Sequence, residues 1–170
     1  MKLVSRLFKP CLLLIALFAL NLQTHAAPKT YNKGAVQKMT IALDAFESEF
    51  QSAYGVWQIV EYDLSSGQSP SAQTKQQLQY VISALAGMSD EIDAMSNAAK
   101  VLGHEHIMQD VENIKLQHAA TLSSTKNLLS GILKGYVDYS EVSNASGGFD
   151  MMERLKDCIR REIQVITGGK

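Results

Sequence analysis

The sequence predicts an all-α protein: an up-down antiparallel four-helix bundle with coiled-coil-like packing and a short fourth helix. The strongest indication is the segment 36–64, where apolar side chains recur at alternating steps of three and four residues over about four heptads. Three later segments repeat this spacing, and nothing after position 26 has the pattern of a sheet. The apolar positions of the first segment are Val36, Met39, Leu43, Phe46, Phe50, Ala53, Trp57, Val60 and Leu64.

The segment 1–26 has the pattern of a secretory signal peptide. Basic residues at its start are followed by an apolar run of about ten residues, a short polar stretch, and then Ala26 and Ala27. The run is too short to cross a hydrocarbon core of about 30 Å as a helix. We expect cleavage after Ala26, which makes 27–170 a single helical-bundle domain. Cleavage after Ala27 is the second choice, and an uncleaved N-terminal anchor is the alternative.

Loss of the signal peptide changes both the charge and the cysteine content of the chain. It removes three of the 16 basic residues and none of the 17 acidic ones, which leaves a net charge of about −4. A mildly acidic exported protein is a poor candidate for binding nucleic acid or an anionic membrane surface. Of the two cysteines only Cys158 stays, so no internal disulfide can staple the fold, which suits a bacterial periplasmic domain.

The first two helices are expected at 32–64 and 70–102, separated by a short break that is rich in serine and contains glycine and proline. Gly103 follows the second helix as a C-terminal stop. The turn after it is so short that the third helix should be an antiparallel neighbour of the second. The apolar positions of the second helix are Leu78, Val81, Leu85, Met88, Ile92, Met95, Ala99 and Leu102.

The third and fourth helices are expected at 105–140 and 150–167. The apolar spacing of the third helix shifts at His118, where two successive steps of four residues locally unwind a supercoil. A polar, glycine-ended linker is expected between these helices, at 140–148. An acidic pattern similar to a capping box then starts the fourth helix.

Motifs that would indicate an enzyme are absent from the sequence. It contains no Glu-x-x-His for a di-iron carboxylate site, no Cys-x-x-Cys-His for covalent haem, no His-Glu-x-x-His and no Gly-x-Ser-x-Gly. Neither a P-loop nor a Rossmann glycine pattern occurs. We therefore predict a protein that is not an enzyme and has no catalytic residues.

Two histidines at the turn between the second and third helices form a weak candidate metal site. His106 and Asp110 are four residues apart, so a helix places both on one face, with His104 nearby. Imidazole and carboxylate groups together can ligate zinc, nickel or copper(II). A transition metal held by these three residues is an alternative to the expected absence of a cofactor, although exposed turn histidines are the simpler interpretation.

Two other side chains have both a functional and a structural interpretation. His118 falls on the apolar seam, where it is either a hydrogen-bonded core histidine or a ligand, for example to haem. Cys158 is next to the seam residue Ile159, so its thiol should be partly shielded. Because the mature chain has no second cysteine, an intermolecular disulfide through Cys158 is an open alternative, and with it a homodimer.

The unequal helix lengths predict a groove at one end of the bundle. At 1.5 Å per residue the first three helices are each about 45–50 Å long, whereas 150–167 reaches only about 27 Å. The end that holds the start of the first helix would have only three walls, unless residues 27–33 or collapse of the three helices closes it. An exposed apolar groove usually marks a binding site, here for a partner helix or an apolar ligand. The groove residues are Met39, Leu43, Ile92, Met95, Ile107 and Ile114.

Together these features favour a periplasmic or secreted protein with a binding role. We expect a partner-binding, chaperone-like or envelope-assembly factor whose partner is a protein of the cell envelope. After signal cleavage no part of the chain should insert stably into a membrane, and nucleic acid is not an expected partner. The alternative is a carrier of a small ligand, a metal or haem that uses the His- and Met-rich open end of the bundle.

Overall fold

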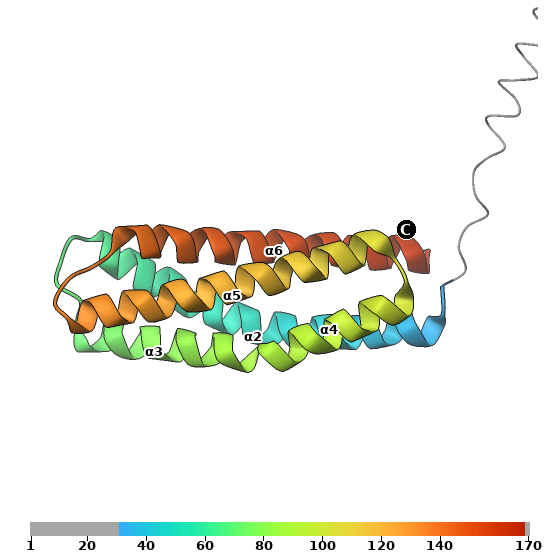
Figure 1. The fold of residues 1–170 in the computed structure, drawn as a ribbon, viewed down its shortest axis with the longest axis horizontal. Helices are drawn as coiled ribbons and strands as arrows, with labels where there is room; N and C mark the ends of the chain where they lie inside the picture. Colours follow the sequence, from blue (N-terminus) through green and yellow to red (C-terminus); the bar gives the residue numbers. More distant parts are fainter. Residues whose placement is uncertain (1–30, 169–170) are drawn as a thin grey trace, which may run out of the picture. The chain divides into compact units, whose positions relative to one another are not determined.

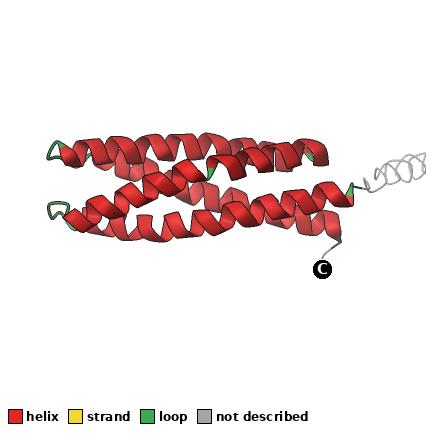
Figure 2. Cartoon of the chain, turned by 90° about the horizontal axis from the view of Figure 1, so that it is seen from below, coloured by secondary structure: helices red, strands yellow, loops and turns green. Residues whose placement is uncertain are grey.

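The computed structural model describes residues 31–168, so the expected signal peptide lies outside the described residues. In this range the chain forms five α-helices and no strand (Figure 1). The helices are α2 (Lys33–Ser65), α3 (Ala72–Gly87), α4 (Ser89–Leu102), α5 (Glu105–Leu133) and α6 (Tyr139–Thr167). Because α3 and α4 follow one another along the same side, the helices make the four legs of an up-down bundle, and the predicted fold class is confirmed (Figure 1, Figure 2).

Each leg of the bundle packs against two others. α2 contacts α3 and α4 on one side and α6 on the other, and α5 likewise contacts both α3–α4 and α6. The first and last helices are therefore neighbours, while α2 and α5 occupy opposite corners. Within the described residues, no helix combines the length and the apolar character that crossing a bilayer requires.

The apolar seam predicted for the first helix forms the centre of the core. Every seam position of 36–64 is buried, and Phe50 and Trp57 are among the largest fully buried side chains. Phe149 of α6 packs against both: its ring centre lies 6.0 Å from that of Phe50, at a tilt, and 5.7 Å from that of Trp57, on which it stacks. Aromatic pairs at such separations add about 0.5–1.5 kcal/mol beyond the burial of their area. This aromatic cluster therefore holds α2 against α6.

The second leg is two helices rather than the single helix predicted at 70–102. The break falls at Met88, whose ψ of −5° departs from the helical value of about −42°. Leu85 and Met88 are both still buried, so the break does not change which face packs inward. His118 of α5 is 6% exposed, and its Nε2 donates to the Leu85 carbonyl at 2.5 Å. His118 is thus a hydrogen-bonded core histidine that gives the last turn of α3 a partner.

The third helix ends at Leu133 rather than at position 140. Gly135 adopts a left-handed conformation with φ +92°, and the Tyr136 N–H donates to the Gly131 carbonyl at 3.1 Å. A left-handed glycine just after the last turn is a common helix stop. Tyr136 and Tyr139, which the longer helix would have placed on its apolar face, are exposed.

The fourth leg is longer than predicted. α6 has 29 residues, as many as α5. Asp138 caps its first turn, because the carboxylate accepts a hydrogen bond from the Ser140 N–H at 3.0 Å. Val142 and Ala145 are buried, so the inward face of the helix continues through 140–148. The predicted linker over 140–148 and the predicted short fourth helix are therefore both wrong.

A close approach of α5 and α6 depends on Gly148. A Cβ atom added there would lie 2.0 Å from Thr121 Oγ1 and 3.2 Å from Thr121 Cβ. The Thr121 hydroxyl also donates to the Gln117 carbonyl at 2.7 Å, which fixes the side chain in this position. Glycine thus serves helix packing here and does not mark the end of an element.

A charge network around the buried Lys156 joins α2 to α6. Lys156 is 3% exposed, and its Nζ donates to Glu47 and Glu153 at 3.1 Å each. Arg160 donates to Glu47 as well, and to Asp44 at 2.7 Å. Burial raises the pKa of Glu47, but the hydrogen bonds and charges of Lys156 and Arg160 outweigh it and hold the pKa below its usual value. Glu47 is therefore held in its ionised form between two cations.

This network should make the stability of the fold sensitive to acid. Because its pKa is lower in the folded chain, Glu47 adds stability that is fully present above the unfolded-chain value of 4.5 and is lost as the pH falls through the folded-state pKa. We expect Glu47→Gln to lower the free energy of unfolding near neutral pH, and the difference from wild type to narrow under acid. Urea unfolding from about pH 7 to about pH 3 measures this difference.

Glu49→Gln is the control for the Glu47 experiment. Glu49 is an exposed carboxylate on the same helix and lies outside the network. We expect its substitution to change the free energy of unfolding little at any pH in the series. If the difference in free energy of unfolding between Glu47→Gln and wild type stays constant across the pH series, the ionised carboxylate does not have the proposed role.

Candidate functional site

The groove predicted at the open end of the bundle is not formed, because the full-length α6 covers it. The residues expected to line it are no more than 2% exposed. They are Met39, Leu43, Ile92, Met95, Ile107 and Ile114. The last turns of α6 reach the turn between α4 and α5, where Glu162 lies beside His104. The six side chains belong to the core, and the prediction that they line an open groove is wrong.

Two of the three predicted metal-site residues, His104 and His106, come together, and Glu162 of α6 joins them. His104 is the N-cap of α5, and its Nδ1 accepts the Ile107 N–H at 3.4 Å. The ring proton of neutral His104 is then on Nε2, which lies 3.5 Å from Glu162 Oε2. His106 Nδ1 lies 3.8 Å from the other Glu162 oxygen. The Glu162 carboxylate thus contacts both histidines at this end of the bundle.

Asp110 lies close to this cluster but is not arranged with it to bind a metal. Burial raises the pKa of Asp110 and the charge of Glu162 raises it further, whereas His106 lowers it. Over residues 31–168, no group of three or more His, Cys, Asp or Glu side chains could hold a metal ion. Both ring nitrogens of His104 already face partners within the chain. We describe the cluster as a polar contact between the start of α5 and the end of α6.

Cys158 is partly exposed on α6, as the sequence predicts for a residue beside the buried seam. The Arg161 Nη2 lies 3.2 Å from its sulfur and donates a weak hydrogen bond to it. The intermolecular disulfide through Cys158 stays a prediction, which non-reducing electrophoresis of the native protein would test.

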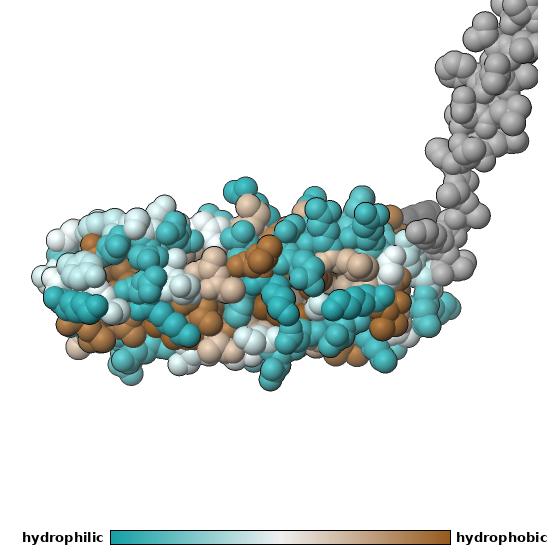
Figure 3. All heavy atoms as spheres, in the orientation of Figure 1, coloured by the Kyte–Doolittle hydropathy of each residue, from teal (hydrophilic) through white to brown (hydrophobic). Residues whose placement is uncertain are grey.

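Large apolar side chains are exposed at several separate places on the bundle. On the face seen in Figure 3, hydrophobic residues interrupt a mainly hydrophilic surface at several points. Single exposed apolar side chains are normal and need no functional explanation. Ile41 and Val101 differ, because they are 60% and 65% exposed and flank the same groove.

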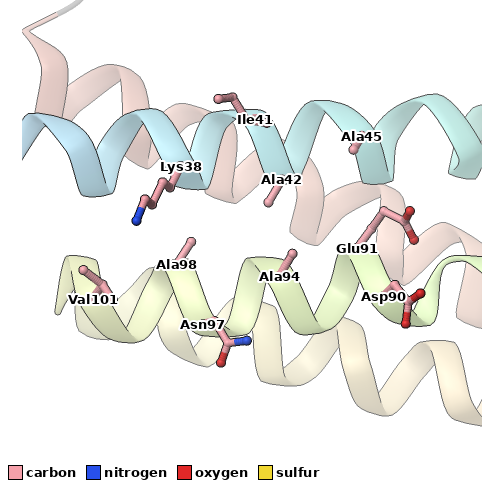
Figure 4. Close-up of a pocket in the computed structure, with 10 residues that line it drawn as sticks. All are labelled: Lys38, Ile41, Ala42, Ala45, Asp90, Glu91, Ala94, Asn97, Ala98 and Val101. Atoms are coloured by element: carbon pink, nitrogen blue, oxygen red, sulfur yellow. The ribbon is translucent and has the colours of Figure 1, made fainter.

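This groove runs between α2 and α4 and has a volume of about 520 Å³ (Figure 4). Its apolar lining consists of Ile41, Ala42, Ala45, Ala94, Ala98 and Val101. Ala94 and Ala98 point toward α2, and Ala42 points toward α4, so short side chains face each other where the two helices pass (Figure 4). Alanine fills little of the space between the helices, and an open apolar trough results.

The two ends of the groove carry opposite charges. Lys38 lies at the end beside Val101, whereas Asp90 and Glu91 lie at the other end, beside Ala45 (Figure 4). Glu91 Oε2 is buried and has no hydrogen-bond partner in the described part of the chain. Within the same range, Lys38 takes part in no ion pair. A donor that entered the groove would pair with this oxygen only after the Glu91 side chain turned toward it.

A second hollow lies at the opposite end of the bundle. It has a volume of about 330 Å³ and is formed by the loop before α3 and the loop before α6, with Tyr136 and Tyr139 in its lining. The Tyr139 hydroxyl donates to the Leu64 carbonyl at 3.4 Å, so this tyrosine also joins the start of α6 to the end of α2. Because its lining is largely polar loop, we regard the α2–α4 groove as the stronger candidate site.

The fold and the groove define the protein as an all-α helical bundle with an open interhelical groove. Comparisons with protein-family models, with curated proteins and with solved structures give no match for this chain.

The groove between α2 and α4 differs in position from the groove that the sequence predicted. The signal for the α2–α4 groove is the pairing of small residues beside the two seams, Ala42 and Ala45 on one helix and Ala94 and Ala98 on the other. These alanines predict a groove only when it is known that the two helices are antiparallel neighbours and that these positions face each other.

Proposed function

We propose that this protein is an exported, non-enzymatic binding protein that recognises a protein partner in the cell envelope through the α2–α4 groove. The observation that carries the proposal is an open apolar trough flanked by exposed Ile41 and Val101 and bounded by charges of opposite sign. Grooves of this kind accept an amphipathic helix, which contributes apolar anchors on one face.

The dimensions of the groove favour a helix as the bound element. The groove follows α4, which has 14 residues and is about 21 Å long at 1.5 Å per residue. Its alanine lining lets a third backbone approach closely, since the distance between packed helices depends on the side chains at the contact. A partner helix of about four turns would cover Ile41 and Val101.

The proposed export rests on the pattern of 1–26 in the sequence. We expect protein recovered from the periplasmic fraction to begin at Ala27 when its N-terminal sequence and intact mass are determined. Recovery of a chain that still carries 1–26, mainly from the cytoplasm, would contradict export.

Site-specific photo-crosslinking in cells tests the proposed groove. A photoreactive residue placed at Ala94 lies within the groove, whereas the same residue at Ala120 is exposed on α5 and serves as the matched control. We expect a discrete adduct from position 94 and none from position 120. Ile41→Asp, which introduces a charge at the groove edge, should abolish that adduct while the bundle stays folded.

The crosslinking experiment has clear contrary results. Equal adducts from both positions would indicate unspecific contact, and no adduct from position 94 would mean that the groove has no protein partner under these conditions. An adduct that persists in Ile41→Asp would place the contact elsewhere. Circular dichroism and thermal unfolding of each variant separate loss of binding from loss of structure.

The volume of the groove favours one alternative, a small apolar ligand. About 520 Å³ lies within the range of about 300–1,000 Å³ that is typical of small-molecule pockets. Native mass spectrometry of the protein purified from the envelope would reveal such a ligand as a defined added mass. A carrier of metal or haem at the open end of the bundle is less well supported, because α6 closes that end.

A further inference from the structure

We propose that the occupant of the α2–α4 groove is the same groove of a second copy, so that two chains form a two-fold symmetric dimer. This inference rests on the proposed function, because it names the protein that the groove binds. It follows from the distribution of charge along the groove and from the groups there that lack a partner.

The charges of the groove are complementary to themselves under a two-fold rotation. The two-fold axis lies in the interface and crosses the groove near its middle. Rotation about it turns the second groove to face the first and reverses it end for end. The Lys38 end of each copy then lies over the Asp90 and Glu91 end of the other, and the exposed Ile41 of each copy, which lies between these ends, faces the other groove. The opposite, parallel arrangement would bring like charges together and is disfavoured.

The groups that lack partners in one chain find them in this arrangement. Glu91 Oε2 is buried without a hydrogen-bond donor, and Lys38 has no carboxylate partner among the described residues. Two-fold docking brings one Lys38 ammonium to each Glu91 carboxylate. A different partner protein would need to supply a matching cation and anion at the right spacing, whereas a second copy carries both.

The size of the contact predicts a weak dimer. A strip about 21 Å long and two helix diameters wide, about 20 Å, covers about 400 Å² per chain. A stable interface of standard size buries about 800 Å² per partner. We therefore expect dimers to form reversibly and only at high protein concentration.

Analytical ultracentrifugation of the 27–170 protein over a wide concentration range tests the proposal, with a reducing agent present to exclude a Cys158 disulfide. We expect wild type to dimerise with increasing concentration. K38E and E91K each place like charges at both contacts and should raise the dissociation constant at least about tenfold. K126E makes the same charge change on exposed α5 and should have no effect.

Mixing the two variants is the decisive measurement. In a dimer of one K38E chain with one E91K chain, the native Glu91 of the first faces the native Lys38 of the second. At the other contact the two substituted positions face each other with opposite charge. We therefore expect the equimolar mixture to associate as tightly as wild type, although neither variant does so alone.

Ile41→Asp provides a second test that leaves α4 intact. This test matters because E91K removes an acidic residue from the first turn of α4, where it favours the helix. Thermal unfolding of every variant is recorded, and Ile41→Asp should abolish the dimer in a folded chain.

Three results would overturn the second-copy proposal. They are a wild-type protein that stays monomeric at every concentration, a dimer that K38E, E91K and Ile41→Asp all leave unchanged, and single variants whose mixture does not recover. A monomeric wild type with a groove-specific crosslink to a different protein would overturn the dimer and leave the proposed function standing. If wild type stays monomeric and position 94 gives no crosslink, both the dimer and the proposed function are overturned.

Discussion

Phe50→Ala is expected to lower the free energy of unfolding by about 3–5 kcal/mol. Phe50 is fully buried, and its ring centre lies 5.5 Å from that of Phe46 and 6.0 Å from that of Phe149. Alanine would remove the ring and leave a cavity that helices packed on every side cannot easily fill. Urea unfolding of the 27–170 protein, followed by circular dichroism, measures the loss.

Tyr62→Ala is the matched control for this experiment. Tyr62 is another aromatic residue of α2 but is 77% exposed, so its removal should change the free energy of unfolding by no more than about 0.5 kcal/mol. A loss below about 1 kcal/mol for Phe50→Ala would mean that α2 presents a different face to the core.

Gly148→Ala is expected to destabilise the fold by about 1–3 kcal/mol, although alanine is the better helix former by about 1 kcal/mol. The added methyl group would overlap Thr121 Oγ1, and the Thr121 Cβ at 3.2 Å leaves little room after the hydroxyl moves. Either Thr121 gives up its hydrogen bond to Gln117 or α5 and α6 move apart. Urea unfolding of the variant measures the net effect.

The adjacent Gly147 supplies the control. A Cβ added at Gly147 meets no atom within 4 Å, so Gly147→Ala should leave packing unchanged and stabilise α6 by up to about 1 kcal/mol. The two substitutions are chemically identical and one residue apart, and they should have opposite signs. Equal effects would show that close packing of α5 on α6 does not limit position 148.

The helical core could be predicted because its pattern is redundant. The seam from Val36 to Leu64 repeats over several heptads, so no single residue decides the assignment, and every seam position proves buried. Gly103 was likewise recognisable as a helix stop, and it adopts φ +67°. Features that depend on many residues at a fixed period survive local irregularities.

The start of α6 was missed because its outer face is polar and contains glycine. Ser143 and Asn144 are exposed, and with Gly147 and Gly148 they resemble a loop when read as a continuous stretch. The buried positions Val142, Ala145, Phe149 and Met152 nevertheless continue the spacing of three and four residues. The polar, glycine-containing composition suggests a loop here, whereas the apolar spacing indicates a helix. The spacing predicts the structure correctly.

The groove could not be predicted from sequence because it depends on which surfaces face each other. Seam residues identify the inside of a bundle, whereas the trough between α2 and α4 is formed by residues beside the seams of two helices. Whether Ala42 and Ala98 leave open space depends on their mutual position, which sequence spacing does not supply. The wrong length for the fourth helix then moved the expected groove into the core.

The contact between α2 and α6 also determines the order in which this chain can complete its fold. Hydrogen bonds across that contact join residues far apart in sequence, for example Tyr54 to Asp150 and Asp44 to Arg160, which are separated by 96 and 116 positions. Closing such long loops is slow in comparison with forming local helical contacts. Whether the chain emerges from a ribosome or from a translocation pore, Phe50 and Trp57 lack their contact with Phe149 until α6 arrives. Because α6 follows α2 late in the chain, the α6-facing side of α2 stays open to aggregation until α6 has been made.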